Sequence, residues 1–164
     1  MNWFVLYTRP RFEKKVVKEL EENGYEAYLP LRKELRQWSD RKKWVEEPLF
    51  RGYVFIKTEI KWLSVATQIS GVAAPITFNG KPAEVREDEI KTIGRILAGP
   101  DAYHVEEVSF IKGEMVEITE GPLKGLTGKW TDYRGGKRVA IVIEQLQKHL
   151  AIEVPVAYVQ KVKK

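Results

Sequence analysis

The sequence contains no cysteine and only two histidines among its 164 residues. A chain without thiols forms no disulfide and supports no thiolate chemistry. His104 and His149 lie far apart, and no other ligand-type residues flank them at the spacing of a metal site. We therefore expect no metal, no cofactor and no histidine-based catalyst, so an enzyme is the class of protein that this composition favours least.

Long apolar runs are also missing. No stretch approaches the roughly 20 apolar residues that a membrane-spanning helix needs, and the first ten residues lack both the basic lead and the apolar core of a signal peptide. The sequence is nevertheless 43% hydrophobic, which is enough to build packed cores. We therefore expect a globular, cytoplasmic protein with no membrane partner.

The charge is moderately basic and unevenly distributed. The formal net charge is +5, which is compatible with a polyanionic partner such as nucleic acid. Residues 1–99 hold 18 Lys and Arg against 14 Asp and Glu, whereas residues 100–164 hold 10 against 9, so the excess is +4 and then +1. A nucleic-acid contact is therefore expected from the first part of the chain.

The first hundred residues alternate between strand and helix patterns. Phe12, Val16 and Leu20 recur at four-residue spacing, which predicts an amphipathic helix that Thr8 caps and that ends at a glycine, Gly24. Further helices are expected within 60–70 and 86–98. Aromatic and β-branched residues predict strands at 3–7, 25–31, 49–57 and 72–78, and a hairpin with arms at 33–38 and 42–46. Together these elements predict an α+β sandwich with a mainly antiparallel sheet.

The remaining residues carry β patterns without a helix signal. Short strands are expected at 115–118, 127–131, 139–143, 150–154 and 157–162, separated by turn residues. Five such strands in about 50 residues suggest a small SH3-like five-stranded β-barrel. The predicted organisation is thus a first domain at 1–98, a linker at 99–108 and a second domain at 109–164.

Two motifs connect this organisation to a known family. Residues 112–129 resemble a KOW motif, in which Gly121, Pro122, Gly125 and Gly128 permit a tight turn and close backbone approach. Residues 3–7 followed by an amphipathic helix, and later residues 48–56, resemble the N-terminal domain of the NusG family. The segments 36–44 and 47–50 look closer to the specialised antiterminator paralogues of the RfaH and UpxY types than to the general factor.

The resemblance implies a transcription elongation and antitermination factor that bridges the clamp of RNA polymerase and suppresses pausing without making or breaking a bond. We expect it to act as a monomer at selected long operons, such as surface-polysaccharide clusters. Its KOW domain would recruit a ribosomal protein or a termination factor. The residues that match the family's polymerase-binding apolar patch are Val5, Tyr7, Tyr53, Phe55 and Phe78.

Basic residues concentrate on the first helix and on the hairpin. Cations neutralise phosphates and flat aromatic rings stack on unpaired bases, and relatives pass the non-template DNA strand of the transcription bubble near this side of the domain. The alternative is a charged face that contacts only solvent. The candidate nucleic-acid-binding residues are Arg9, Arg11, Lys14, Lys15, Lys18, Arg41, Lys42 and Lys43.

Two other functions stay open at this point. The chain could be the general NusG factor that acts genome-wide with Rho, or a KOW-type RNA-binding or ribosome-associated protein. A polymerase-bound factor depends on the polymerase for its binding, whereas the RNA-binding alternative predicts salt-sensitive binding to free RNA.

Overall fold

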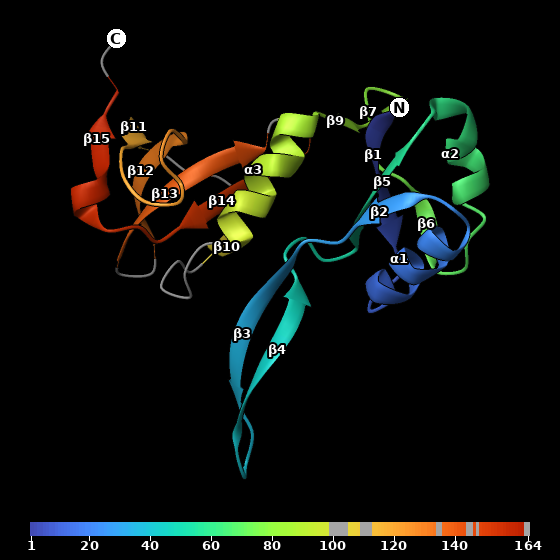
Figure 1. Cartoon of the computed structure of the whole chain (residues 1–164), viewed down its shortest axis with the longest axis horizontal. Helices are drawn as coiled ribbons and strands as arrows, with labels where there is room; N and C mark the ends of the chain where they lie inside the picture. Colours follow the sequence, from blue (N-terminus) through green and yellow to red (C-terminus); the bar gives the residue numbers. More distant parts are fainter. Residues whose placement is uncertain (99–104, 109–112, 134–135, 144–145, 147, 163–164) are drawn as a thin grey trace. The chain divides into compact units, whose positions relative to one another are not determined.

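The structure is a computed structural model that describes residues 1–98, 105–108, 113–133, 136–143, 146 and 148–162 (Figure 1). The chain divides into two compact units, residues 1–90 and residues 91–164. The first unit mixes helices and strands and the second is rich in strands, which confirms the predicted α+β fold class. The domain limits at 98 and 109 stay a prediction, because the division between the units falls within helix α3 (Glu87–Leu97).

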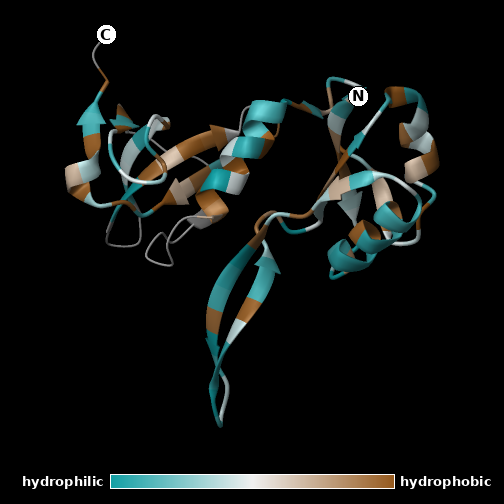
Figure 2. Ribbon diagram, in the orientation of Figure 1, coloured by the Kyte–Doolittle hydropathy of each residue, from teal (hydrophilic) through white to brown (hydrophobic). Residues whose placement is uncertain are grey.

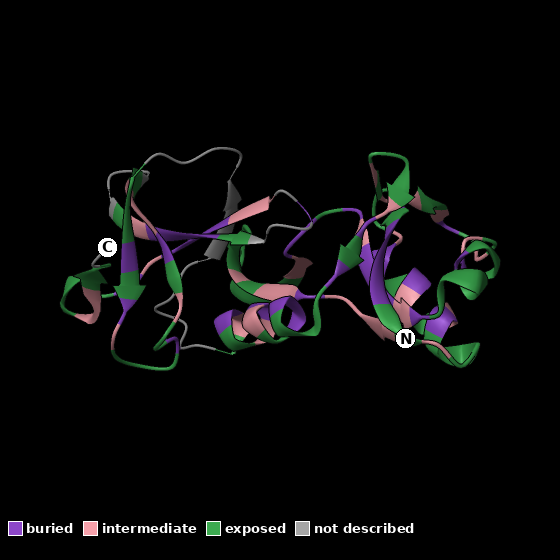
Figure 3. Ribbon diagram, turned by 90° about the horizontal axis from the view of Figure 1, so that it is seen from above, coloured by how far each residue is buried: buried purple, intermediate pink, exposed green. Residues whose placement is uncertain are grey.

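The first unit is built on an antiparallel sheet around β1 (Asn2–Thr8). Strand β1 pairs on one side with β5 (Tyr53–Thr58), and β5 pairs with β2 (Glu26–Tyr28). On the other side, β1 pairs with β6 (Val72–Pro75) and with β9 (Glu84–Val85). Most residues of the two central strands, β1 and β5, are buried (Figure 3). Their composition of aromatic and β-branched residues suits this buried, pleated position.

Helices α1 (Glu13–Glu22) and α2 (Ile60–Ala66) cover one face of this sheet. Val16 and Leu20 of α1 are fully buried against it, as their four-residue spacing predicts. Burial of this apolar surface is the main force that holds the layers together. The complete core cluster consists of Phe4, Leu6, Val16, Leu20, Val54, Ile56, Leu63 and Ala66.

The start of α1 differs from the prediction. Thr8 does not cap the helix, because Arg11 has a φ of 67° and interrupts helical geometry after Pro10. The helix begins at Glu13 instead, with Phe12 at the N-cap position and no side-chain cap. The predicted end is confirmed, since the helix stops at Glu22 and Gly24 adopts a φ of 85°, a conformation that favours glycine at a helix end.

A long hairpin forms a separate two-stranded sheet that projects from the rest of the first unit (Figure 1). Its strands are β3 (Leu31–Gln37) and β4 (Lys42–Pro48), and we call this hairpin the ribbon. The register runs from Leu31 opposite Pro48 to Gln37 opposite Lys42. The turn closes where the backbone N–H of Trp38 donates to the carbonyl of Arg41 at 2.7 Å. The two predicted hairpin arms are thereby confirmed.

The single strand predicted at 72–78 is divided in two. Strand β6 ends at Pro75, and β7 (Thr77–Phe78) pairs with β8 (Lys81–Pro82) in a small hairpin of its own. Asn79 and Gly80, which connect β7 and β8, both have positive φ, 53° and 74°. An Asn-Gly pair of this kind is the preferred two-residue turn of a β-hairpin.

Among its described residues, the second unit contains the greater part of α3, one antiparallel sheet and a short 3-10 helix, η2 (Val156–Tyr158). The five predicted strands are present, and a sixth, β10 (Val105–Val108), forms from residues that were expected in the linker. It does so because its backbone pairs with β14. The others are β11 (Glu114–Ile118), β12 (Thr127–Tyr133), β13 (Gly136–Ile143), β14 (Lys148–Ile152) and β15 (Val159–Lys161), and the sheet order is β10-β14-β13-β12-β11-β15.

Candidate functional site

The side of the first sheet that faces away from α1 carries four of the five predicted polymerase-binding residues. Val5 lies opposite Phe55, and Tyr7 lies opposite Tyr53, in the register of β1 and β5. Because side chains alternate along a strand, these four share one face, while Phe4, Leu6, Val54 and Ile56 point to the helices. The fifth residue, Phe78, lies on the separate β7–β8 hairpin.

Only part of this set is accessible. The Tyr7 side chain is 46% exposed and Tyr53 is half-buried, whereas Val5 and Phe55 are fully buried. A partner protein can therefore touch the two tyrosines directly but not Val5 or Phe55. We call the two tyrosines the aromatic surface.

The aromatic surface stands on a cluster of packed rings. The rings of Tyr7 and Tyr53 meet edge to face, with centroids 6.2 Å apart. Phe50 packs against Tyr53 at 6.4 Å and against Phe55 at 6.2 Å, and Tyr28 packs against Phe55 at 6.2 Å. Such pairs hold rings in defined orientations and add stability beyond burial. Burial also raises the pKa of the Tyr28 hydroxyl, because a buried phenolate is poorly solvated.

Sequence reasoning missed the supporting roles of Phe50 and Tyr28. Phe50 is almost completely buried and belongs to the 48–56 segment that resembles the family. Gly52 in the same segment has a φ of 79°, and a Cβ there would lie 3.1 Å from Cε2 of Tyr7. The Gly52 carbonyl accepts a 2.7 Å hydrogen bond from the backbone N–H of Thr8. The loop before β5 thus fixes the position of the Tyr7 ring.

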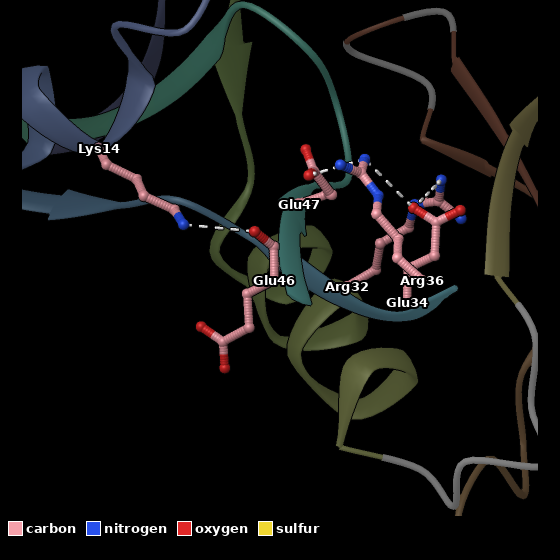
Figure 4. A network of polar contacts seen from close by, with 6 residues as sticks. All are labelled: Lys14, Arg32, Glu34, Arg36, Glu46 and Glu47. Atoms are coloured by element: carbon pink, nitrogen blue, oxygen red, sulfur yellow. Dashed lines mark hydrogen bonds and ion pairs between the residues drawn. The ribbon is translucent and has the colours of Figure 1, made fainter. Parts of the chain in front are cut away.

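The predicted basic residues of the first helix are all exposed. We call this set the basic surface: Arg9, Arg11, Lys14, Lys15 and Lys18. Arg9 and Arg11 precede α1, and Lys14 and Lys18 follow one another at one helical turn. The Lys14 ammonium reaches the ribbon, where it donates to the backbone carbonyl of Glu46 at 3.3 Å (Figure 4). The structure therefore brings the basic surface next to the base of the ribbon.

The cations of the ribbon fall into two groups. Arg41, Lys42 and Lys43 are exposed at its tip, as predicted from the sequence. Arg36, which lies opposite Lys43 in the register, is held by carboxylates, with its guanidinium 2.9 Å from Glu47 and 3.7 Å from Glu34 (Figure 4). Since its charge is largely compensated, the tip cations are better placed than Arg36 to meet a polyanion.

A cavity of about 550 Å³ adjoins the aromatic surface, the start of α1 and the base of the ribbon. The buried Oε1 of Glu13 has no hydrogen-bond partner within the part of the chain that the structure describes. Ionic side chains from three elements make the cavity polar. Its lining includes Tyr7, Arg11, Glu13, Arg36, Glu47 and Arg51.

The KOW motif residues shape the turn between β11 and β12. Gly121 and Gly125 have φ values of 86° and 95°, which glycine adopts without strain. Leu123 between them is almost fully buried, while Pro122 is exposed. The carbonyls of Pro122 and Lys124 accept hydrogen bonds of 3.1 and 2.8 Å from the guanidinium of Arg95. The turn is therefore stabilised both by the hydrogen bonds from Arg95 and by the burial of its own Leu123.

No group of three or more His, Asp or Glu side chains that could hold a metal ion occurs among the described residues. Within the same residues, no helix is long and apolar enough to cross a membrane.

Comparison with known proteins finds matches to this chain in one family. Residues 1–94 match the family model of NusG, described as transcription termination factor nusG. The transcription termination/antitermination proteins NusG of Halalkalibacterium halodurans and Bacillus subtilis are 22% and 24% identical over 176 residues, covering 98% of this chain and of each relative. A structure that describes domain interaction in Thermotoga maritima NusG aligns over 99% of this chain and 97% of its own, with a TM-score of 0.61 and 22% identity.

The architecture and the match over more than half of the chain define a transcription factor of the NusG type. The chain belongs to the NusG family.

Proposed function

We propose that the protein is a non-catalytic elongation and antitermination factor that binds RNA polymerase through the aromatic surface. The observation that carries this proposal is the Tyr7–Tyr53 pair, which is accessible on the sheet face opposite the helices. The rings of the pair contact one another, and Phe50 packs against Tyr53. A rigid, partly exposed aromatic pair is a typical anchor for a protein partner, because its rings bury a large area and lose little conformational freedom.

The buried residues have a different part in this proposal. Val5 and Phe55 lie beside the tyrosines on the same sheet face and are fully buried, so they would act on binding through the tyrosines rather than by contact. Phe78 is half-buried on the β7–β8 hairpin and would form a second, separate contact. With these contacts the first unit would bridge the polymerase clamp and reduce pausing and termination.

The proposal includes a nucleic-acid contact by the basic surface and the ribbon tip. These exposed cations belong to neighbouring elements, since Lys14 of α1 bonds to strand β4, and together they offer one basic region to the non-template DNA strand of the transcription bubble. Action at selected long operons, rather than genome-wide with Rho, is the narrower part of the proposal and follows from the resemblance of the ribbon sequence to the specialised paralogues.

The KOW turn would recruit a second protein, either a ribosomal protein or a termination factor. Leu123 is buried at 1% exposure, so such a partner has to contact the exposed residues of the turn, Pro122 and Lys124, rather than the leucine.

The test is binding of the full-length protein to a reconstituted elongation complex and to free RNA at matched salt. We expect preference for the complex, and we expect Tyr7→Ala and Tyr53→Ala each to weaken that binding by about 30-fold, since a central aromatic anchor contributes about 2 kcal/mol or more. Met115→Ala in the second unit is a matched control, because Met115 is 49% exposed and Tyr7 46%, and it should bind as the wild type does.

Equal binding to free RNA, with no effect of either tyrosine substitution, would overturn the polymerase proposal. That result would instead favour a KOW-type RNA-binding protein, and the slope of affinity against salt would then report the number of phosphates that the protein contacts.

A further inference from the structure

The two faces of the ribbon differ in chemistry. Because side chains alternate along a strand, Arg32, Glu34 and Arg36 share one face of β3. Glu47 lies opposite Arg32 in the register and completes a set of ion pairs on that face (Figure 4). Leu35 and Trp44 lie directly opposite one another on the other face. On one face the charged side chains pair with one another, whereas the other face presents an apolar pair.

This apolar pair is open to solvent. Leu35 is 47% exposed and Trp44 is 56% exposed. The ribbon is a two-stranded sheet of its own that extends away from the rest of the first unit (Figure 1), and most of it is hydrophilic (Figure 2). An exposed leucine and tryptophan side by side on a projecting element point to a surface that a ligand covers.

The two tryptophans of the ribbon are not equivalent. The Trp38 ring has the Arg41 guanidinium 5.3 Å from its centroid and the Lys43 ammonium 5.5 Å from it. Cations at these distances are attracted to the ring face. Within residues 1–98, which include the whole ribbon, no cation and no second ring lies against Trp44. Trp44 is therefore the ring with a face available to a ligand.

The charge around Trp44 indicates the chemistry of that ligand. The whole ribbon with its turn, residues 31–48, contains six cations and four anions, so its net charge is +2. Lys33, Lys42 and Glu46 lie on the same face of the ribbon as Trp44, so that face keeps one positive charge in excess. Positive charge beside an open aromatic ring matches a strand with phosphates and unpaired bases. It disfavours a second copy of the same basic ribbon, because like charges repel.

We propose that Trp44, backed by Leu35, is the platform on which one unpaired base of single-stranded DNA stacks. Trp38 has a different role, which is to hold Arg41 and Lys43 in place for the neighbouring phosphates. The inference rests on the proposed function, since a transcription bubble exposes a DNA strand of this kind. A base in a duplex is already stacked and paired, so the platform selects single strands.

The experiment measures affinity of the full-length protein for a fluorescently labelled 12-nucleotide oligothymidylate and for a 12-base-pair duplex over a series of salt concentrations. We expect Trp44→Ala to weaken single-strand binding about tenfold and to leave duplex binding unchanged. Its salt slope should equal that of the wild type, because no phosphate contact is removed. Trp44→Phe should restore most of the affinity.

Lys42→Ala is the matched charge variant. We expect it to lower the salt slope for the single strand by about 0.7, the value for one phosphate contact, which a loss of stacking does not do. Because all of these positions are exposed on the ribbon, the variants should fold as the wild type does, and circular dichroism checks this.

Two results would overturn the stacking proposal. One is single-strand affinity that Trp44→Ala leaves unchanged, and the other is an equal loss for single strand and duplex. If the Trp44→Ala variant instead loses self-association of the protein, the surface is an interface between two copies. Any of these outcomes leaves the polymerase proposal standing as long as Tyr53→Ala still releases the elongation complex.

Discussion

Replacing Phe55 by alanine is expected to lower the free energy of unfolding of the first unit by about 3–5 kcal/mol. Phe55 is fully buried, and its ring packs against Tyr28 and Phe50. Truncation removes these contacts and leaves a cavity that the surrounding β-strands cannot fill, because β1 and β2 hold β5 on both sides. The measurement is urea denaturation followed by hydrogen exchange of the strands in the first unit.

Tyr53→Ala provides the matched comparison on the same strand. Tyr53 is only half-buried, so its loss should cost clearly less stability than the loss of Phe55 while weakening polymerase binding more at equal folded fraction. This difference separates a residue that supports the aromatic surface from one that contacts the partner. If Phe55→Ala cost no more stability than Tyr53→Ala, this division into a supporting and a contacting residue would be wrong.

Replacing Gly128 by alanine is expected to destabilise the second unit by about 3 kcal/mol. Gly128 lies in β12, where a Cβ would stand 2.5 Å from the carbonyl oxygen of Ala140 and 2.9 Å from Cγ1 of Val139 on the neighbouring strand. Because the closest atom belongs to the backbone of β13, the strands themselves have to separate. Loss of hydrogen-exchange protection in β12 and β13 would report this change.

Gly125→Ala is the control within the same motif. A Cβ there meets no atom within 4 Å, so the cost comes only from its φ of 95° and should be about 1–2 kcal/mol. If both substitutions cost the same, backbone conformation and not close approach of strands would explain the glycines of the KOW motif.

The supporting residues hold the two tyrosines of the aromatic surface in position before a partner binds. Tyr7 contacts Gly52 and the ring of Tyr53, and Phe50 packs against Tyr53. The surface is therefore part of the folded core rather than a flexible loop, and a partner that binds it does not have to order it first.

Local sequence pattern predicted many elements of this fold. The four-residue spacing of Phe12, Val16 and Leu20 indicated α1 and its buried side, and β-rich segments separated by turn residues indicated the strands of the second unit. The pattern did not predict β10, because its four residues become a strand only by pairing with β14, which lies more than 40 residues further along the chain. Nor did it show that Arg11 delays the start of α1.

By itself, then, the sequence determined the fold class, the family and the residue types of the candidate surfaces, because periodicity, turn residues and motifs are local properties of the chain. Only the tertiary structure decided which of those residues are accessible. Val5 and Tyr7 are both apolar or aromatic members of one strand face, yet one is buried and the other exposed. Trp38 and Trp44 are both ribbon tryptophans, yet within residues 1–98 cations lie against the ring of Trp38 and not against that of Trp44. Accessibility depends on which distant segments pack over a side chain or extend away from it, and this is fixed by pairing and packing over the whole unit.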